Sequence, residues 1–210
     1  MGDPAGPLSD IARYYSDRLA EHGATARGVD WNGEEGQRTR FAQLCKIIEG
    51  GSPFSVNDLG CGYGALCEYL AGLYRDFSYS GFDLSRDMIL AAETRHAGRA
   101  AARFRVADAP GSVADYGMAS GIFNVRLERP DGDWAQQIER TLDTLDRTSR
   151  RGFAFNCLSS YSDADKRRDY LYYADPGRLF DWCKRRYSSR VALLHDYGLY
   201  EFTILVRKLT

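Results

Sequence analysis

The chain has 210 residues, of which 44% are hydrophobic, so it is long enough to bury one hydrophobic core. Its 28 Lys and Arg residues nearly cancel its 29 Asp and Glu residues, which argues against a global field that attracts nucleic acid or an anionic membrane. No stretch approaches the ~20 consecutive apolar residues of a membrane span, and residues 1–10 lack the blocks typical of a signal peptide.

The cysteines point to a reducing compartment. They are odd in number, are scattered along the chain and form no Cys-x-x-Cys pair. This pattern favours reduced thiols over a disulfide framework or a zinc site, so we expect a cytoplasmic protein without a structural metal. The five are Cys45, Cys61, Cys67, Cys157 and Cys183.

Two helices are expected first, followed by an alternation of strands and helices. Apolar residues recur at helical spacing over residues 8–22 and 37–49, with a polar, glycine-containing loop between them. Short apolar runs then alternate with helical patterns. The predicted strands are 54–59, 79–84, 104–108, 117–124, 152–158, 191–197 and 201–208, and the later helices are 65–74, 85–97, 134–147 and one that opens at 175–176.

This alternation predicts an α/β fold, in which helices cover both faces of a mostly parallel seven-stranded sheet. Ser85 is the expected N-cap of one helix, and Asp175-Pro176 is the expected start of another. The last two strands are too close together for a helical crossover, so they should pair antiparallel, with the last strand reversed. Ligands of such sheets bind beyond the carboxyl ends of the strands.

A glycine-rich motif, Asp58-Leu-Gly60-Cys-Gly62-Tyr-Gly64, lies where the first strand turns into a helix. Glycine there allows positive φ and a close approach of the backbone to a ligand, near the free N–H groups of a helix start. The spacing differs from the Gly-x-Gly-x-x-Gly of dinucleotide-binding loops, and the preceding acid suits a ligand with a positive group. The alternative is a purely structural glycine turn.

Acids also end the second and third strands. Asp83 is placed to accept hydrogen bonds from a ribose diol, although it could instead cap a helix beside Ser85. Asp108 could accept the amino group of an adenine ring, or could be a turn residue before Pro110. Acids follow three successive strands, so a purely structural explanation would have to hold for all three at once. Such an explanation is weaker for the three acids together than for any one of them.

These motifs resemble those of the class I S-adenosylmethionine-dependent methyltransferases. The resemblance rests on residues 56–64, 81–85, 106–109 and 121–124, and on the terminal strand pair. It implies a Rossmann-like seven-stranded sheet with a reversed last strand. It also implies a methyltransferase core at residues 51–210 and an N-terminal helical cap over the cofactor site at residues 1–50.

The resemblance also implies roles for matching residues. The glycine loop would hold the methionine part of S-adenosylmethionine, Asp83 the ribose and Asp108 the adenine, while Asn124 would lie near the transferred methyl group. Tyr14 and Trp31 are candidates from the cap. The expected cofactor residues are Asp58, Gly60, Cys61, Gly62, Asp83, Leu84, Asp108, Ala109, Asn124, Tyr14 and Trp31.

The acceptor pocket is expected after the fourth, fifth and sixth strands, where aromatic residues cluster. His195 is the candidate general base, with Asn124 as the second catalytic candidate, although His195 could instead be a hydrogen-bonded residue at a strand end. The tyrosines could alternatively cover the sheet edge. The expected substrate residues are Arg126, Tyr161, Tyr172, Tyr173 and Tyr197.

The expected function is S-adenosylmethionine-dependent O- or N-methylation of a small molecule, such as a natural product or a modified sugar. Asn124-Val-Arg-Leu lacks the Pro-Pro-aromatic sequence of one amino-methylating subclass, which is therefore disfavoured. The alternatives are a nicotinamide-dependent oxidoreductase, which the glycine spacing disfavours, a non-catalytic protein that retains the fold, and a macromolecular methyltransferase. No nucleic-acid or membrane partner is expected, and a homodimer is left open.

Overall fold

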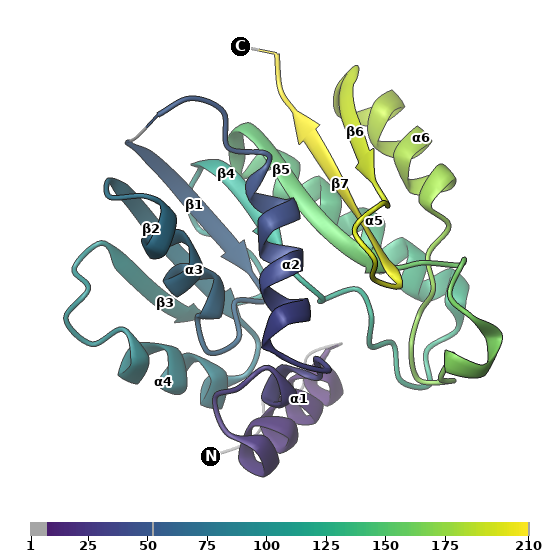
Figure 1. Cartoon of the computed structure of the whole chain (residues 1–210), viewed down its shortest axis with the longest axis horizontal. Helices are drawn as coiled ribbons and strands as arrows, with labels where there is room; N and C mark the ends of the chain where they lie inside the picture. Colours follow the sequence, from purple (N-terminus) through teal and green to yellow (C-terminus); the bar gives the residue numbers. More distant parts are fainter. Residues whose placement is uncertain (1–7, 52, 210) are drawn as a thin grey trace.

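The protein is built on a seven-stranded sheet, seen in a computed structural model that describes residues 8–51 and 53–209 (Figure 1). The strand order is β3-β2-β1-β4-β5-β7-β6. All neighbours from β3 to β5 pair parallel, whereas β7 is antiparallel to both β5 and β6. The predicted sheet with its reversed last strand is confirmed. The strands are β1 Phe54–Leu59, β2 Phe77–Asp83, β3 Ala102–Val106, β4 Ala114–Ala119, β5 Ser149–Leu158, β6 Arg190–Leu194 and β7 Glu201–Arg207.

Helices cover both faces of the sheet, and the first helix lies at the carboxyl ends of the parallel strands (Figure 1). Buried side chains of α2, α3 and α4 form one core with β1 and β2, and those of α5 and α6 form a second core with β5 and β7. In the described residues, no helix is both long and apolar enough to cross a membrane. The helices are α1 Ser9–His22, α2 Glu34–Cys45, α3 Ala65–Leu73, α4 Arg86–Arg95, α5 Asp131–Arg147 and α6 Pro176–Arg186, with short 3-10 turns at Arg27–Val29 and Ala164–Lys166.

The two predicted helix starts are confirmed. Ser85 Oγ accepts a hydrogen bond from the backbone N–H of Met88 at 3.1 Å, and Asp175 Oδ1 accepts one from the backbone N–H of Arg178 at 3.0 Å. Pro176 occupies the first turn of α6, where its missing N–H costs nothing. The Ser85 cap fixes the start of α4 directly after β2, and the Asp175 cap fixes the start of α6 at the end of the long loop after β5.

The predicted fourth strand, 117–124, begins and ends too late in the sequence. β4 ends at Ala119, and residues 120–124 form a turn with Gly121 at φ 78°. The apolar residues of this turn imitate a strand because they are buried: Phe123 is 2% exposed and its ring packs 5.7 Å from that of Phe155. Asn124 therefore lies in the loop after β4 and does not end the strand.

Helix α1 lies at the carboxyl edge of the parallel strands (Figure 1). Two side-chain contacts anchor it there: Ser16 Oγ lies 2.8 Å from Ser85 Oγ, and Asp10 forms an ion pair of 2.6 Å with Arg129. Ile11 is buried in the core on the α5 side. The cavities beneath α1 are consequently bounded by the N-terminal helix as well as by the sheet.

Candidate active site

The glycine turn after β1 is shaped by backbone conformations that favour glycine. Gly60, Gly62 and Gly64 have φ of 74°, 53° and 81°. A Cβ on Gly60 would overlap Ile122 Cγ2, so the turn can approach the loop after β4 only without a side chain. The turn therefore packs directly against Ile122 at the carboxyl end of β1.

Asp83 holds this turn from the end of β2. Its Oδ2 accepts a hydrogen bond from Gly62 N–H at 2.9 Å, and its Oδ1 accepts one from Ser85 N–H at 2.9 Å. Burial raises the pKa of Asp83, although these backbone hydrogen bonds act in the opposite direction. Each oxygen keeps a free lone pair, so the carboxylate can also accept hydrogen bonds from a hydroxyl-bearing ligand.

Asp58 lies beneath the same turn and is 2% exposed. The hydroxyl of Tyr79 donates to its Oδ2, while its Oδ1 has no hydrogen-bond partner in the described residues. Burial raises the pKa of Asp58 to about 7, and the bond from Tyr79 opposes that rise. Asp58 does not line any of the three cavities described below, so its expected role near a cationic ligand group stays a prediction.

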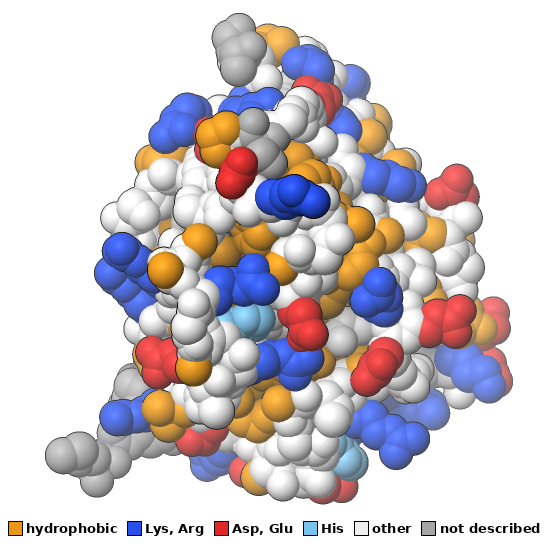
Figure 2. All heavy atoms as spheres, turned by 60° about the vertical axis from the view of Figure 1, so that its left-hand side comes forward, with side chains coloured by type: hydrophobic (Ala, Val, Ile, Leu, Met, Phe, Trp, Pro, Cys, Tyr) orange, Lys and Arg blue, Asp and Glu red, His pale blue; other side chains and the backbone are white. Residues whose placement is uncertain are grey.

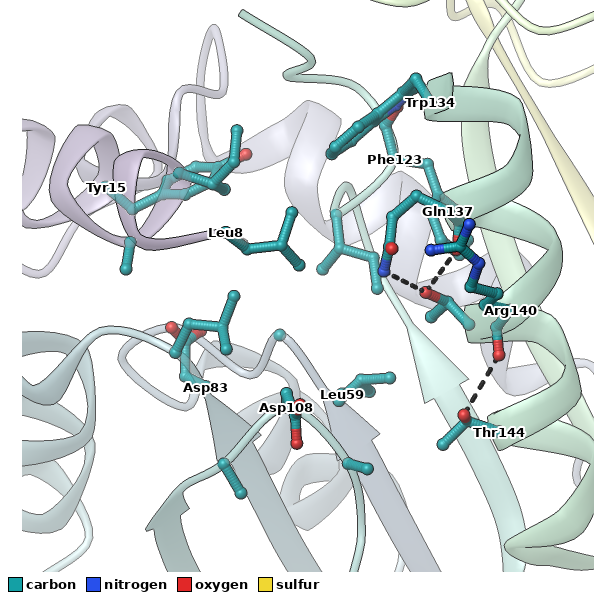
Figure 3. A pocket seen from close by; sticks show the side chains of 18 residues that line it. Leu8, Tyr15, Leu59, Asp83, Asp108, Phe123, Trp134, Gln137, Arg140 and Thr144 are labelled. Carbon is teal, nitrogen blue, oxygen red and sulfur yellow. Dashed lines mark hydrogen bonds between the residues drawn. The ribbon is translucent and has the colours of Figure 1, made fainter. Parts of the chain in front are cut away.

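A cavity of about 270 Å³, here called the α5 cavity, opens between α1 and α5 (Figure 3). Asp83 and Asp108 contribute carboxylates from the ends of β2 and β3, whereas Leu8 and Phe123 contribute apolar walls. On its far side Trp134 is fixed by a hydrogen bond from Nε1 to the carbonyl of Phe123 at 2.8 Å. A mostly apolar cavity with a few placed acids suits a nucleoside.

A smaller cavity of about 50 Å³, the central cavity, continues from the glycine turn. It shares Gly60 and Asp83 with the α5 cavity, and Tyr15 lines both. Ser120 borders it, and its Oγ is buried without a hydrogen-bond partner in the described residues. The unpartnered hydroxyl fits a polar ligand group in this space.

A third cavity of about 300 Å³, the tyrosine cavity, adjoins the central one. Tyr15, Trp31 and Gly121 line both cavities, and Tyr170, Tyr173 and Tyr200 line the tyrosine cavity alone. The three cavities therefore adjoin one another in a row, from the ends of β2 and β3 to the loop after β5.

Trp31 forms the boundary between the central and tyrosine cavities. The Trp31 ring lies so close to Gly121 that a Cβ on Gly121 would overlap it. The Arg40 guanidinium stacks over the same ring, 3.8 Å from its centroid. Such a cation–π contact favours a fixed ring position. Gly121 and Arg40 thus hold the indole from its two sides.

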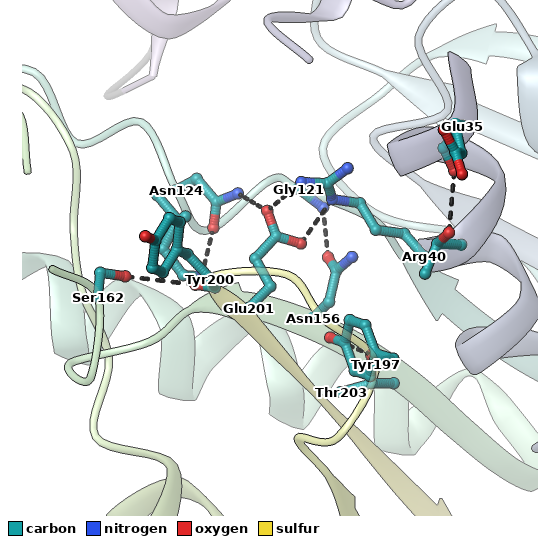
Figure 4. A network of polar contacts seen from close by, with 12 residues as sticks. Glu35, Arg40, Gly121, Asn124, Asn156, Ser162, Tyr197, Tyr200, Glu201 and Thr203 are labelled. Carbon is teal, nitrogen blue, oxygen red and sulfur yellow. Dashed lines mark hydrogen bonds and ion pairs between the residues drawn. The ribbon is translucent and has the colours of Figure 1, made fainter. Parts of the chain in front are cut away.

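Arg40 belongs to a buried polar network under the tyrosine cavity (Figure 4). Its Nε and Nη2 donate to the two carboxylate oxygens of Glu201 at 2.7 and 3.1 Å. Asn124 Nδ2 donates to Glu201 Oε1 at 3.4 Å, and Asn124 Oδ1 accepts from Leu158 N–H at 2.9 Å. The network joins α2 to β7 and to the loop after β4.

Most of the predicted cofactor residues lie together. Trp31 lines the central and tyrosine cavities, and Asn124 lines the tyrosine cavity. The Tyr14 hydroxyl instead donates to Asp30 at 2.7 Å, and Cys61 is buried with its side chain against Gly81. The predicted residues that line the α5 cavity are Gly60, Asp83, Leu84, Asp108 and Ala109, and Gly62 lines the central cavity.

Of the predicted substrate residues, only Tyr173 lines the tyrosine cavity. Arg126 bonds the carbonyls of Leu127 and Arg129 and pairs with Asp131, and Tyr197 bonds Thr203 Oγ1. Tyr161, which is 76% exposed, and Tyr172, which is half-buried, also lie outside the lining. The predicted catalytic residue His195 lies outside it as well, exposed, with its ring near those of Tyr161 and Phe202.

Arg40 and Glu201 are lining residues that the sequence analysis missed. Nothing in the sequence around Arg40 distinguishes it from other charged residues of a helix. Glu201 carries a weak signal, because it is a lone charge directly before the apolar run of the last strand.

Comparison with known proteins agrees with this arrangement. The family described as "Methyltransferase domain" matches residues 56–147. A relative named "Putative methyltransferase Rv1506c", from Mycobacterium tuberculosis (strain ATCC 25618 / H37Rv), is 61% identical to this chain over 163 residues. The match covers 78% of this chain and 98% of the relative. The chain therefore belongs to the methyltransferase family, and the resemblance seen in the sequence is confirmed.

Solved structures show the same fold at low identity. A structure described as a DhpI-SAH complex has a TM-score of 0.64 and 18% identity, covering 96% of this chain and 97% of its own. Magnesium protoporphyrin IX methyltransferase from Synechocystis PCC 6803 with bound SAM has a TM-score of 0.66 and 14% identity, covering 99% and 100%. The nicotinamide-dependent alternative is not supported by any of these similarities.

Proposed function

We propose that the protein transfers a methyl group from S-adenosylmethionine to a small-molecule acceptor, with the cofactor in the α5 and central cavities and the acceptor in the tyrosine cavity. The observation that carries this proposal is that the three cavities meet at one side chain, because Tyr15 lines all of them. Relatives of the same fold support it, since two were solved with SAH and with SAM bound.

The residues present fit this cofactor. In the proposal Asp108 faces the adenine, Asp83 accepts from the ribose hydroxyls, and the glycine turn above Asp58 receives the methionine part. Ser120, whose buried Oγ has no hydrogen-bond partner in the described residues, borders the central cavity, where this part of the cofactor would lie. When bound, S-adenosylmethionine supplies a methyl group already activated by its sulfonium.

The task left to the chain is orientation. Trp31, held by Arg40 and Gly121, is proposed to position the acceptor against the methyl group, and the aromatic walls exclude water. Holding two reactants in a reactive geometry can supply about 7–11 kcal/mol of a barrier. A general base is needed only where the acceptor must lose a proton, and the assignment of that role to His195 stays a prediction.

The N-terminal helix is proposed to cap the cofactor. Leu8, Ile11 and Tyr15 line the α5 cavity from α1, so the helix shields the proposed adenosine site. A cytoplasmic location is also proposed, because all five cysteines are free and buried.

A small acceptor is proposed rather than a macromolecule. On the face shown in Figure 2, Lys and Arg side chains are interspersed with Asp and Glu and form no continuous basic surface. The tyrosine cavity, at about 300 Å³, has the size of a small-molecule site.

The test is calorimetric titration with S-adenosylhomocysteine. We expect Asp83→Asn to weaken binding by about tenfold or more, because a neutral amide loses a charge-assisted hydrogen bond to the ribose. The control is Asp87→Asn, an exposed acid in the first turn of α4. Circular dichroism and the melting temperature of each variant verify its folding. Absence of binding to the folded wild-type protein would refute the proposed function.

A further inference from the structure

We infer that the acceptor carries an oxyanion, such as a carboxylate or a phosphate, which is bound by Arg168 and Lys166 at the wall of the tyrosine cavity. The inference rests on the proposed function, because it names the substrate class of the same site. It follows from the charges that line the cavity and from the partners that those charges already have.

The cavity is lined by three cations and two carboxylates. Both carboxylates are neutralised. Glu201 is 1% exposed and forms the bidentate pair with Arg40. Asp30 accepts from the Tyr14 hydroxyl at 2.7 Å and pairs with Arg18, which lies outside the cavity lining, at 3.0 Å.

The two remaining cations lack a comparable partner. Arg168 forms no ion pair with a carboxylate of the described residues, and its Nη1 bonds only the carbonyls of Asp165 and Arg167, at 3.3 and 2.9 Å. Lys166 lies 3.4 Å from Asp165, and both of these side chains are more than half exposed, so the attraction is weak. The cavity is therefore left with positive charge that no acid of its own lining offsets.

The acids of the neighbouring segment do not face this cavity. Asp163 accepts from the Tyr200 hydroxyl, and neither Asp163, Asp165 nor Asp169 lines the cavity. The arginine fork and the lysine ammonium are the groups that recognise carboxylate and phosphate oxygens.

The backbone that carries Arg168 is anchored to neighbouring groups. The backbone N–H of Arg168 donates to the Tyr173 hydroxyl at 2.9 Å, and the backbone N–H of Tyr172 donates to the Asn124 carbonyl at 2.7 Å. The segment after β5 is thereby tied to the loop after β4. Neither cation lines the central cavity, where the methyl group is proposed to lie. The geometry thus separates the oxyanion from the atom that receives the methyl group.

The experiment is an NMR titration of the protein saturated with S-adenosylhomocysteine, using benzoate, phenyl phosphate and the neutral analogue benzamide. We expect both oxyanions to shift backbone amides around Arg168 saturably, and benzamide to bind at least about tenfold more weakly. Arg168→Gln and Lys166→Gln should each reduce the preference, and the double variant should abolish it. Arg185→Gln, an exposed arginine on α6, removes the same charge elsewhere and should leave the preference unchanged.

Equal affinity for benzoate and benzamide would overturn the inference, as would a preference that survives the double variant. No shift with any probe up to about 10 mM would also overturn it. Because calorimetry measures S-adenosylhomocysteine binding in the same samples, failure of the proposed function is seen separately as loss of that binding. A difference in affinity between benzoate and phenyl phosphate distinguishes a carboxylate acceptor from a phosphate acceptor.

Discussion

The ion pair between Arg40 and Glu201 gives the sharpest test of the packing around the site. Glu201 is 1% exposed and the Arg40 side chain 11%, and two charge-assisted hydrogen bonds join them. Replacing one partner leaves the other charge buried and unpaired, which typically costs about 3–5 kcal/mol. We therefore expect Arg40→Met and Glu201→Met each to lower the free energy of unfolding by about that amount.

The double variant is expected to be less destabilised than either single one. Two methionines fill a similar volume, and replacing a buried ion pair by apolar side chains is often neutral or even stabilising. Some loss remains, because the contacts of Arg40 with Trp31 and of Glu201 with Asn124 disappear. The cycle should thus give a coupling energy of about 3 kcal/mol or more.

Urea denaturation is the assay, followed by far-UV circular dichroism and by tryptophan fluorescence. Coincident transitions with both probes are required for a two-state analysis. If the single losses simply add in the double variant, or if Glu201→Met costs less than about 1 kcal/mol, the pair contributes no more than a surface ion pair. The account of the buried network would then be wrong.

Three further outcomes are expected. Gly60→Ala should lower the free energy of unfolding by about 2 kcal/mol or more in urea denaturation, because the φ of Gly60 is positive and a Cβ there overlaps Ile122. It should also weaken S-adenosylhomocysteine binding in calorimetry. Its control, Gly72→Ala, should not destabilise the protein, because the space around a Cβ at Gly72 is open. The unfolded chain releases the Asp58 proton near its ordinary pKa of 3.8, whereas the folded chain releases it only near 7. As the pH rises between these two values, the wild type should therefore lose stability relative to Asp58→Asn by about 1.4 kcal/mol per pH unit. A pH-independent difference in melting experiments would contradict this. Ser85→Ala should lower stability by about 1 kcal/mol through loss of the α4 cap, and no measurable change would show that the cap is dispensable.

The proposed cofactor half of the site was predictable because its residues follow local patterns in the sequence. The glycine turn, Asp83 and Asp108 each follow directly after a strand, and parallel strands bring their carboxyl ends to one edge. The positions of these residues therefore follow from element order alone, without knowledge of any long-range contact.

The acceptor half depends on contacts that no local pattern encodes. Arg40 and Glu201 are 161 residues apart in the chain yet hydrogen-bonded. The expectation for His195 illustrates the same limit. Because β7 inserts between β5 and β6, β6 becomes an edge strand, and the residue that follows it lies outside the cavity lining. The order of strands in a sheet is a tertiary property.

The position of β7 also has a consequence for the order of assembly during synthesis. Of the seven strands, this one is synthesised last, yet it occupies an interior place in the sheet and brings Glu201 to Arg40. Until it arrives, β5 presents an open edge to which other chains can pair. The strands that border the α5 cavity can pair beforehand, whereas the tyrosine cavity lacks a wall until residue 201 is in place. We therefore expect newly made chains to acquire the proposed nucleotide pocket before the acceptor pocket.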